Sequence, residues 1–201
     1  MKQGYIFLFL ILFILPIMAQ ESNPQSTNLP YYQIPEYPEE YSAATVAARM
    51  IDGLGFRYYW ATDGLREQDL IFRPNDEART TDETLDHILS LSKMIVNSTL
   101  KKPNVRADEK PVLSFEEKRK QTLDNLKLAS DILKAGKPGE MNDFNIVFKN
   151  GDKETSYPFW NQITGPIADA IWHTGQVVSF RRSSGNPFNS KVSVFNGKLR
   201  E

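Results

Sequence analysis

The 201-residue chain contains no cysteine. It can therefore form no disulfide bond and cannot be lipidated on a cysteine, so its stability has to come from packing and from any bound metal ion. An excess of one charge is also lacking, because 24 Lys and Arg stand against 25 Asp and Glu, for a formal net charge of −1. This balance offers no electrostatic footprint for nucleic acid or for an anionic membrane surface, and we expect neither partner.

Histidine is scarce too, since the chain has only His87 and His173. They fall in two different segments with a helical pattern, and Asp169 precedes His173 by four residues. Positions i and i+4 of a helix share one face, so a histidine from a facing helix could complete a metal site with three protein donors. Taken alone, His87 is more typical of a hydrogen-bonded core or boundary residue. The three residues together indicate a metal site but no substrate.

The N-terminus has the pattern of an export signal. Lys2 is followed by an apolar run from Tyr5 to Met18, which ends at Ala19-Gln20. This run is shorter than the roughly 20 apolar residues that a spanning helix needs. We therefore predict a signal peptide at residues 1–19, export to the periplasm or beyond the cell, and no stable membrane span after cleavage. An uncleaved anchor is the alternative, because Ile17 stands where a small residue is preferred.

Residues 20–40 are predicted to form an N-terminal arm, because they are polar and contain four prolines. Tyr31, Tyr32, Ile34 and Tyr37 could hold the last part of this arm against the domain. A solvated linker is the alternative. Residues 41–201 are predicted to form one domain, whose short C-terminal tail is uninformative in sequence.

Four segments have the apolar spacing of helices packed in a bundle. Thr80-x-x-Glu83 and Ser114-x-x-Glu117 are typical capping boxes at the starts of two of them. Arg181 and Arg182 fall in the last turn of the fourth, where cations complement exposed carbonyls. Gly53 and Gly55 in the first indicate either a bend or a close approach of a neighbour. The predicted helices run from Ser42 to about Leu65, from Thr80 to about Leu100, from Ser114 to Gly136, and from near Thr164 to Gly185.

A β-hairpin is predicted between the third and fourth helices. Two strand-like runs, Phe144 to Phe148 and Lys153 to Tyr157, flank Asn150-Gly151, and Asn-Gly readily takes the positive φ angles of a tight turn. The hairpin could cover a site or merely connect the two helices.

The pattern resembles the DinB/YfiT-like family of metalloenzymes. The resemblance spans Tyr41 to Pro187 and rests on Phe72-Arg-Pro74, Glu83-Thr-Leu-Asp-His87 and Asp169-Ala-Ile-Trp-His173-Thr-Gly-Gln176. It implies an all-α fold, a four-helix bundle with up-down-down-up topology, here with a small β-hairpin between helices 3 and 4. Because members of the family are often dimeric, it also implies that a homodimer could form.

The resemblance assigns His87 to the family's helix-two ligand and His173 to the second histidine of its helix-four pair. Asp169 stands where the family has the first histidine of that pair. A two-His, one-carboxylate site still leaves positions for water or substrate, and it suits Zn, Ni, Mn or Fe(II). The departure could instead mean a degraded site, in which Asp169 only orients His173 through a hydrogen bond.

The resemblance implies a metal-dependent transferase or hydrolase that acts on a small-molecule substrate, because some relatives are transferases that use small thiols, and the predicted signal peptide makes it an exported one. No general base stands out, because a capping role already accounts for Glu83. Trp160 and Trp172 could wall a pocket, although aromatic residues of a bundle are more often core. The alternative is a non-catalytic binding or stress-related module that keeps the fold with a degraded or structural metal site.

Overall fold

The computed structural model describes residues 29–106 and 111–201, and these residues form a mostly helical fold with a small sheet. The prediction of a helix-dominated fold is therefore confirmed. The predicted signal peptide, residues 1–19, lies outside the described residues. The long helices are α1 (Ala43–Thr62), α3 (Thr81–Thr99), α4 (Phe115–Ala135) and α6 (Ala168–Ser183).

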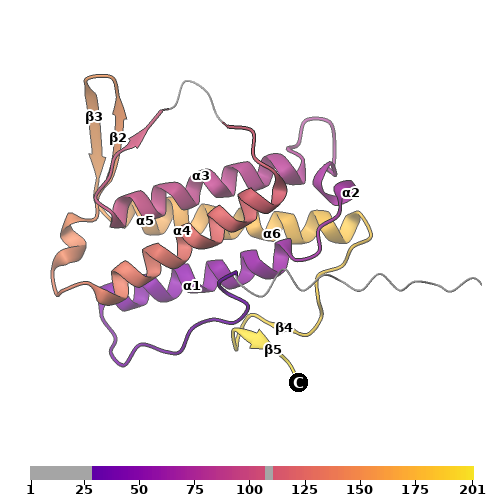
Figure 1. Ribbon diagram of the computed structural model, residues 1–201, viewed down its shortest axis with the longest axis horizontal. Helices are drawn as coiled ribbons and strands as arrows, with labels where there is room; N and C mark the ends of the chain where they lie inside the picture. The colour runs from indigo at the N-terminus through magenta and orange to yellow at the C-terminus, as the bar shows by residue number, and fades with distance from the viewer. Residues whose placement is uncertain (1–28, 107–110) are drawn as a thin grey trace, which may run out of the picture.

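The four long helices pack side by side (Figure 1). α1 packs against α4 and α6, and α3 packs against the same two helices. The predicted seam of α1 is confirmed, because its apolar positions at alternating spacings of four and three are fully or almost fully buried. Burial of such seams is the main stabilising contribution in a chain without disulfides. The buried seam residues are Ala47, Ile51, Leu54, Tyr58 and Ala61, whereas Leu65, the last position predicted for the seam, follows the end of α1 and is only partly buried.

Both predicted capping boxes are present. The Thr80 backbone N–H donates to Glu83 Oε2 at 2.7 Å, and the Glu83 N–H donates back to the Thr80 hydroxyl at 3.1 Å. Ser114 and Glu117 make the same reciprocal pair at 2.8 and 3.2 Å. The Thr80 backbone N–H lowers the pKa of Glu83, as the Ser114 N–H lowers that of Glu117. These boxes fix where α3 and α4 begin.

The predicted hairpin consists of β2 (Ile146–Asn150) and β3 (Lys153–Tyr157), antiparallel to each other, with Gly151 at φ +58° in the turn. A short strand, β1 (Asn104–Val105), joins β2 in parallel and gives a three-stranded sheet. The sequence did not indicate β1, because two residues carry no periodicity. The hairpin rises from one end of the bundle and points away from the helices, across their direction (Figure 1).

Three short helices were not predicted. α2 (Glu67–Leu70) follows α1, and a 3-10 turn, η1 (Glu140–Asp143), follows α4. Before α6, α5 (Trp160–Gln162) continues into a π-helical turn, η2 (Ile163–Ile167), that contains Pro166. Helical structure therefore begins a few residues before the predicted start near Thr164, because the kink at Gly165 and Pro166 interrupts the helix without ending it.

The described part of the N-terminal arm, residues 29–40, lies on the domain, as the sequence suggested for the last part of the arm, and residues 20–28 lie outside the described residues. Tyr31 is 4% exposed, and its hydroxyl donates to the buried Asp52 of α1 at 3.0 Å. The indole N–H of Trp60 donates to the Tyr32 carbonyl at 3.1 Å. The Ile34 N–H donates to the Gly197 carbonyl at 2.8 Å, beside the C-terminal strands β4 (Val192–Ser193) and β5 (Lys198–Leu199). Arm and tail thus meet against α1.

Gly55 leaves room for this arm, so its role is a close approach and not a bend. A Cβ on Gly55 would overlap the ring of Tyr31, which is held in the left-handed region at φ 75°. We expect Gly55→Ala to destabilise the fold by about 1–3 kcal/mol through overpacking, despite the better helix propensity of alanine. Denaturant unfolding followed by circular dichroism measures the change.

Gly53→Ala is the matched control on the same helix. A Cβ on Gly53 would meet only the flexible end of Arg57, at 3.2 Å. This substitution should be neutral or stabilise by up to about 1 kcal/mol, because helix propensity then dominates. Equal effects of both substitutions would show that the contact between Tyr31 and Gly55 contributes nothing specific.

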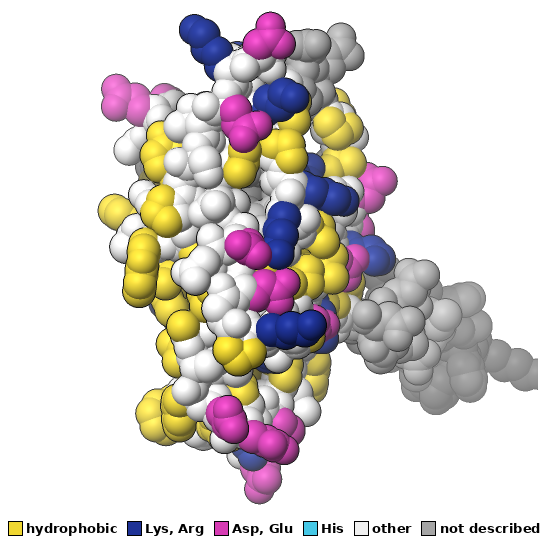
Figure 2. Space-filling view, turned by 90° about the vertical axis from the view of Figure 1, so that its left-hand side faces the viewer, with side chains coloured by type: hydrophobic (Ala, Val, Ile, Leu, Met, Phe, Trp, Pro, Cys, Tyr) yellow, Lys and Arg dark blue, Asp and Glu magenta, His cyan; other side chains and the backbone are white. Residues whose placement is uncertain are grey.

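On the face drawn in Figure 2, acidic and basic side chains are interspersed among hydrophobic ones. Among the helices that the structure describes, none combines the length and the apolar composition of a membrane-spanning segment.

Candidate metal centre

α3 and α6 bring the three predicted ligands to one place. On α3, Asp86 points toward α4 and accepts from Lys118 Nζ at 3.0 Å. The next residue, His87, is rotated by about 100° around the helix and faces α6. On α6, Asp169 and His173 are one turn apart on the same face. Together these residues form a triad, His87, Asp169 and His173, in which each offers a donor atom within 4.8 Å of the other two.

The Asp169 carboxylate contacts both imidazole rings, each through a different oxygen. Its Oδ2 lies 3.2 Å from His87 Nε2, and its Oδ1 lies 3.3 Å from His173 Nε2. The two rings are perpendicular, with their centroids 4.5 Å apart. Two ligands of a tetrahedral ion with bonds of 2.0–2.1 Å are about 3.3 Å apart, and each imidazole nitrogen lies at about this separation from one of the two carboxylate oxygens.

Gln176 determines the tautomer of His173, that is, which ring nitrogen carries the proton and which has the lone pair. Gln176 Oε1 lies 2.7 Å from His173 Nδ1, one turn further along α6. A carbonyl oxygen only accepts, so this contact places the proton of a neutral ring on Nδ1 and the lone pair on Nε2. Nε2 of His173 lies 3.3 Å from Asp169 Oδ1 and is left with a lone pair that can coordinate a cation.

The donor set therefore fits a divalent ion. Two imidazole nitrogens and one carboxylate are ligands that Zn, Ni, Mn and Fe(II) accept, and they leave positions open. Gln176 supplies the outer hydrogen bond that usually orients a ligating histidine. The side chains of His87, Asp169 and His173 are 29%, 37% and 16% exposed, so solvent reaches the site without leaving it fully open.

A side-chain contact and a backbone turn flank the site. The ring of Phe72 packs against that of Phe180 on α6, with centroids 5.9 Å apart. This contact holds the segment before α3 against α6, at one end of the helix face that carries Asp169 and His173. At the other end, the π turn with its kink at Gly165 directly precedes α6 and ends two residues before Asp169. π turns inside helices are frequent at functional sites.

Other residues singled out in the sequence lie elsewhere. Trp160 and Trp172 are 76% and 73% exposed, so the expectation that they are core residues is wrong. Glu83 serves the cap of α3. Arg181 was predicted to complement the carbonyls at the end of its own helix. Its guanidinium instead donates to the carbonyls of Trp60 and Ala61 at the end of α1, at 3.1 and 3.0 Å.

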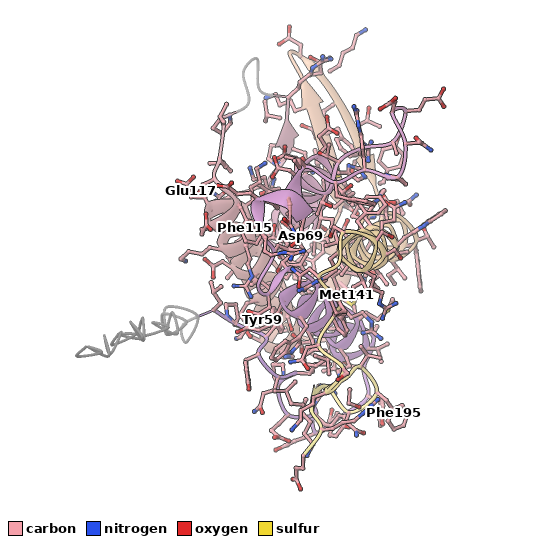
Figure 3. The ribbon with its side chains drawn as sticks, turned by 90° about the vertical axis from the view of Figure 1, so that its right-hand side faces the viewer. Tyr59, Asp69, Phe115, Glu117, Met141 and Phe195 are labelled. Atoms are coloured by element: carbon pink, nitrogen blue, oxygen red, sulfur yellow. The ribbon has the colours of Figure 1, made fainter. Side chains whose placement is uncertain are left out.

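A buried polar cluster around Asp69, at the end of the helices, was not predicted from the sequence (Figure 3). Asp69 is fully buried and accepts hydrogen bonds from Arg66, Ser184 and Asn186. The last two partners are more than a hundred residues away along the chain, so no local motif indicates them.

The chain was compared with protein-family models, with curated proteins and with solved structures, and none of them matches.

Proposed function

We propose that this chain is an exported, DinB-like metal-dependent enzyme of the transferase or hydrolase type, with His87, Asp169 and His173 as the ligands of a divalent ion. The observation that carries the proposal is the convergence of the only two histidines of the chain on one carboxylate from a facing helix. Export rests on the sequence of residues 1–19. The substrate would be a small molecule that reaches the exposed side of the triad.

The running directions of the helices support the assignment to this fold. In Figure 1, α1 and α6 run one way and α3 and α4 run the other, which in chain order is up-down-down-up. The hairpin of β2 and β3 falls between α4 and α6, as proposed for this topology. His87 lies on the second of the four long helices, and Asp169 and His173 lie on the fourth. These are the positions that the family uses for its ligands.

The residues of the site would hold the ion and orient its ligands. A bound ion would supply Lewis acid chemistry, which lowers the pKa of a coordinated water or thiol. Gln176 fixes the tautomer and the ring orientation of His173, and the carboxylate of Asp169 would reduce the net charge of the centre. Three protein ligands leave at least one position for a substrate atom, on the side where Asp169 is exposed.

Metal content tests the proposal. The mature protein, reconstituted in turn with Zn, Ni, Mn and Fe(II) and then desalted, should retain about one ion per chain by elemental analysis. His87→Ala and His173→Ala should each lose it, because two protein ligands rarely suffice. Circular dichroism of both variants controls for folding. Absence of retained metal in the wild type with all four ions would defeat the site assignment.

A non-catalytic binding or stress-related module is the second candidate, and one observation favours it. Asp169 lies within hydrogen-bond distance of His87, at 3.2 Å, and 3.3 Å from His173, so direct contacts among the three side chains can hold the site together without an ion. A folded wild type that retains no metal would support this candidate.

A further inference from the structure

A groove lies on the side of α6 that faces away from the triad. Its α6 lining includes Ile171, Gly175, Val178 and Arg182, which recur at spacings of four, three and four. Each of the first three lies two positions after Asp169, His173 or Gln176, which rotates it by about 200° to the opposite side of the helix. The opposite wall is formed by the tail from Phe188 to Val194, and Arg57 of α1 also lines the groove.

The groove combines an apolar floor with positive charge. Ile171, Val178 and Phe188 are partly buried and Val192 is 6% exposed, so the floor is a packed apolar surface. The lining that the structure describes contains two arginines and no Asp or Glu. Its volume is about 650 Å³, within the roughly 300–1,000 Å³ of small-molecule sites.

The guanidinium groups of Arg57 and Arg182 have N–H donors that make no hydrogen bond to the described residues. Within the described part of the chain, Arg57 donates to the Gly53 carbonyl at 2.9 Å and forms no salt bridge, and Arg182 has neither a salt bridge nor a side-chain hydrogen bond. By contrast, Arg66 and Arg119 are paired with carboxylates. The hydroxyls of Thr174 and Ser179 donate to carbonyls of α6, so the arginines are the cationic donors of the groove.

We propose that this groove binds a small amphipathic anion, with an aliphatic part on the apolar floor and a carboxylate or similar head group held by Arg57 and Arg182. An Arg–carboxylate pair can form two parallel hydrogen bonds, which orients the head group as well as attracting it. The apolar floor excludes a fully solvated inorganic anion as the preferred ligand, because burial of the chain contributes most of the binding free energy. The site is independent of the proposed metal centre.

Decanoate is the probe, with decanol and acetate as its uncharged and chain-free counterparts. By isothermal titration calorimetry on the mature protein, decanoate should bind saturably at one site, at least tenfold more tightly than either counterpart. The affinity for decanoate should fall with added salt, because salt screens the attraction between its carboxylate and the solvent-accessible arginines. Equal affinity for decanol would overturn the proposal, as would binding only to vesicles of anionic phospholipid.

Two kinds of variant locate the binding. Arg57→Gln and Arg182→Gln should each weaken decanoate binding about tenfold, while Arg79→Gln, an exposed arginine elsewhere, should leave it unchanged. Gly175→Leu should abolish binding by filling the groove, because a Cβ on Gly175 meets no atom within 4 Å.

Gly175→Leu also separates blockage from unfolding. The substitution replaces an exposed helical glycine, so the melting temperature should stay the same or rise. Its metal content should equal that of the wild type, since the side chain points away from the triad. Wild-type decanoate affinity in Gly175→Leu, or in the double variant of Arg57 and Arg182, would overturn the assignment. Loss of metal with intact decanoate binding would defeat only the proposed metal centre.

Discussion

Asp169→Ala is expected to lower the affinity for a divalent ion by about 100-fold or more, because it removes the carboxylate that contacts both histidines. Asp169→His should retain the ion, since imidazole restores the three-histidine set that the resemblance implies. The histidine variant should also shift the preference toward Zn or Ni and away from Mn, because a nitrogen donor replaces a harder oxygen. Competition titrations against a chelator of known affinity measure all three proteins.

Asp124→Ala is the control for this series, because Asp124 is a half-exposed carboxylate on α4 that pairs only with Lys120 one turn away. Its metal affinity should equal that of the wild type. If Asp169→Ala bound the ion as tightly as the wild type, Asp169 would be an orienting residue and not a ligand. If Asp169→His lost the ion while Asp169→Ala kept it, the site would need the smaller side chain.

Asp69→Asn should destabilise the protein by about 2–4 kcal/mol at pH 7, the largest effect on stability that we expect from one carboxylate. The Asp69 carboxylate accepts from Arg66 Nη2 at 2.8 Å, from the Ser184 hydroxyl at 2.5 Å and from the Asn186 amide at 2.7 Å. It thus joins α2 to the segment where α6 ends. The exposure of Arg66 on one side keeps the expected loss below that of a fully buried pair.

The contribution of Asp69 should depend on pH. Burial would raise the pKa of Asp69, but the hydrogen bonds from Arg66, Ser184 and Asn186 outweigh it and hold the pKa well below its usual range. A carboxyl whose pKa is lowered by folding stabilises the protein above its unfolded pKa, about 3.9. This stability is lost as the pH falls through the folded pKa. The gap in unfolding free energy between wild type and Asp69→Asn should therefore narrow below about pH 4.

Asp76→Asn is the matched control, because Asp76 is fully exposed and pairs with Arg73 across 3.4 Å. It should change the free energy of unfolding by less than about 0.5 kcal/mol at any pH. Urea denaturation between pH 2.5 and pH 7 compares the three proteins. A constant gap for Asp69→Asn across this range would show that the carboxylate is not preferentially charged in the folded state.

Local patterns predicted the elements whose causes are local. The capping boxes at Thr80 and Ser114, the seam of α1 and the turn at Gly151 each depend on residues a few positions apart, and the structure has them where the sequence indicates. β1 and α2 escaped prediction because two to four residues show no period. The early start before α6 escaped it because Pro166 usually begins a helix, whereas here it lies inside a kinked one.

The sequence by itself determined the identity of the three candidate ligands, because a chain with two histidines leaves little choice and the i, i+4 rule places Asp169 beside His173. Only the tertiary structure decided that His87 reaches them and that Gln176 orients His173. It also decided that the tail folds back to form a groove with α6, and that Asp69 joins segments more than a hundred residues apart. These contacts depend on the packing of distant segments, and sequence periodicity within one helix carries no information about which neighbour its other face will meet.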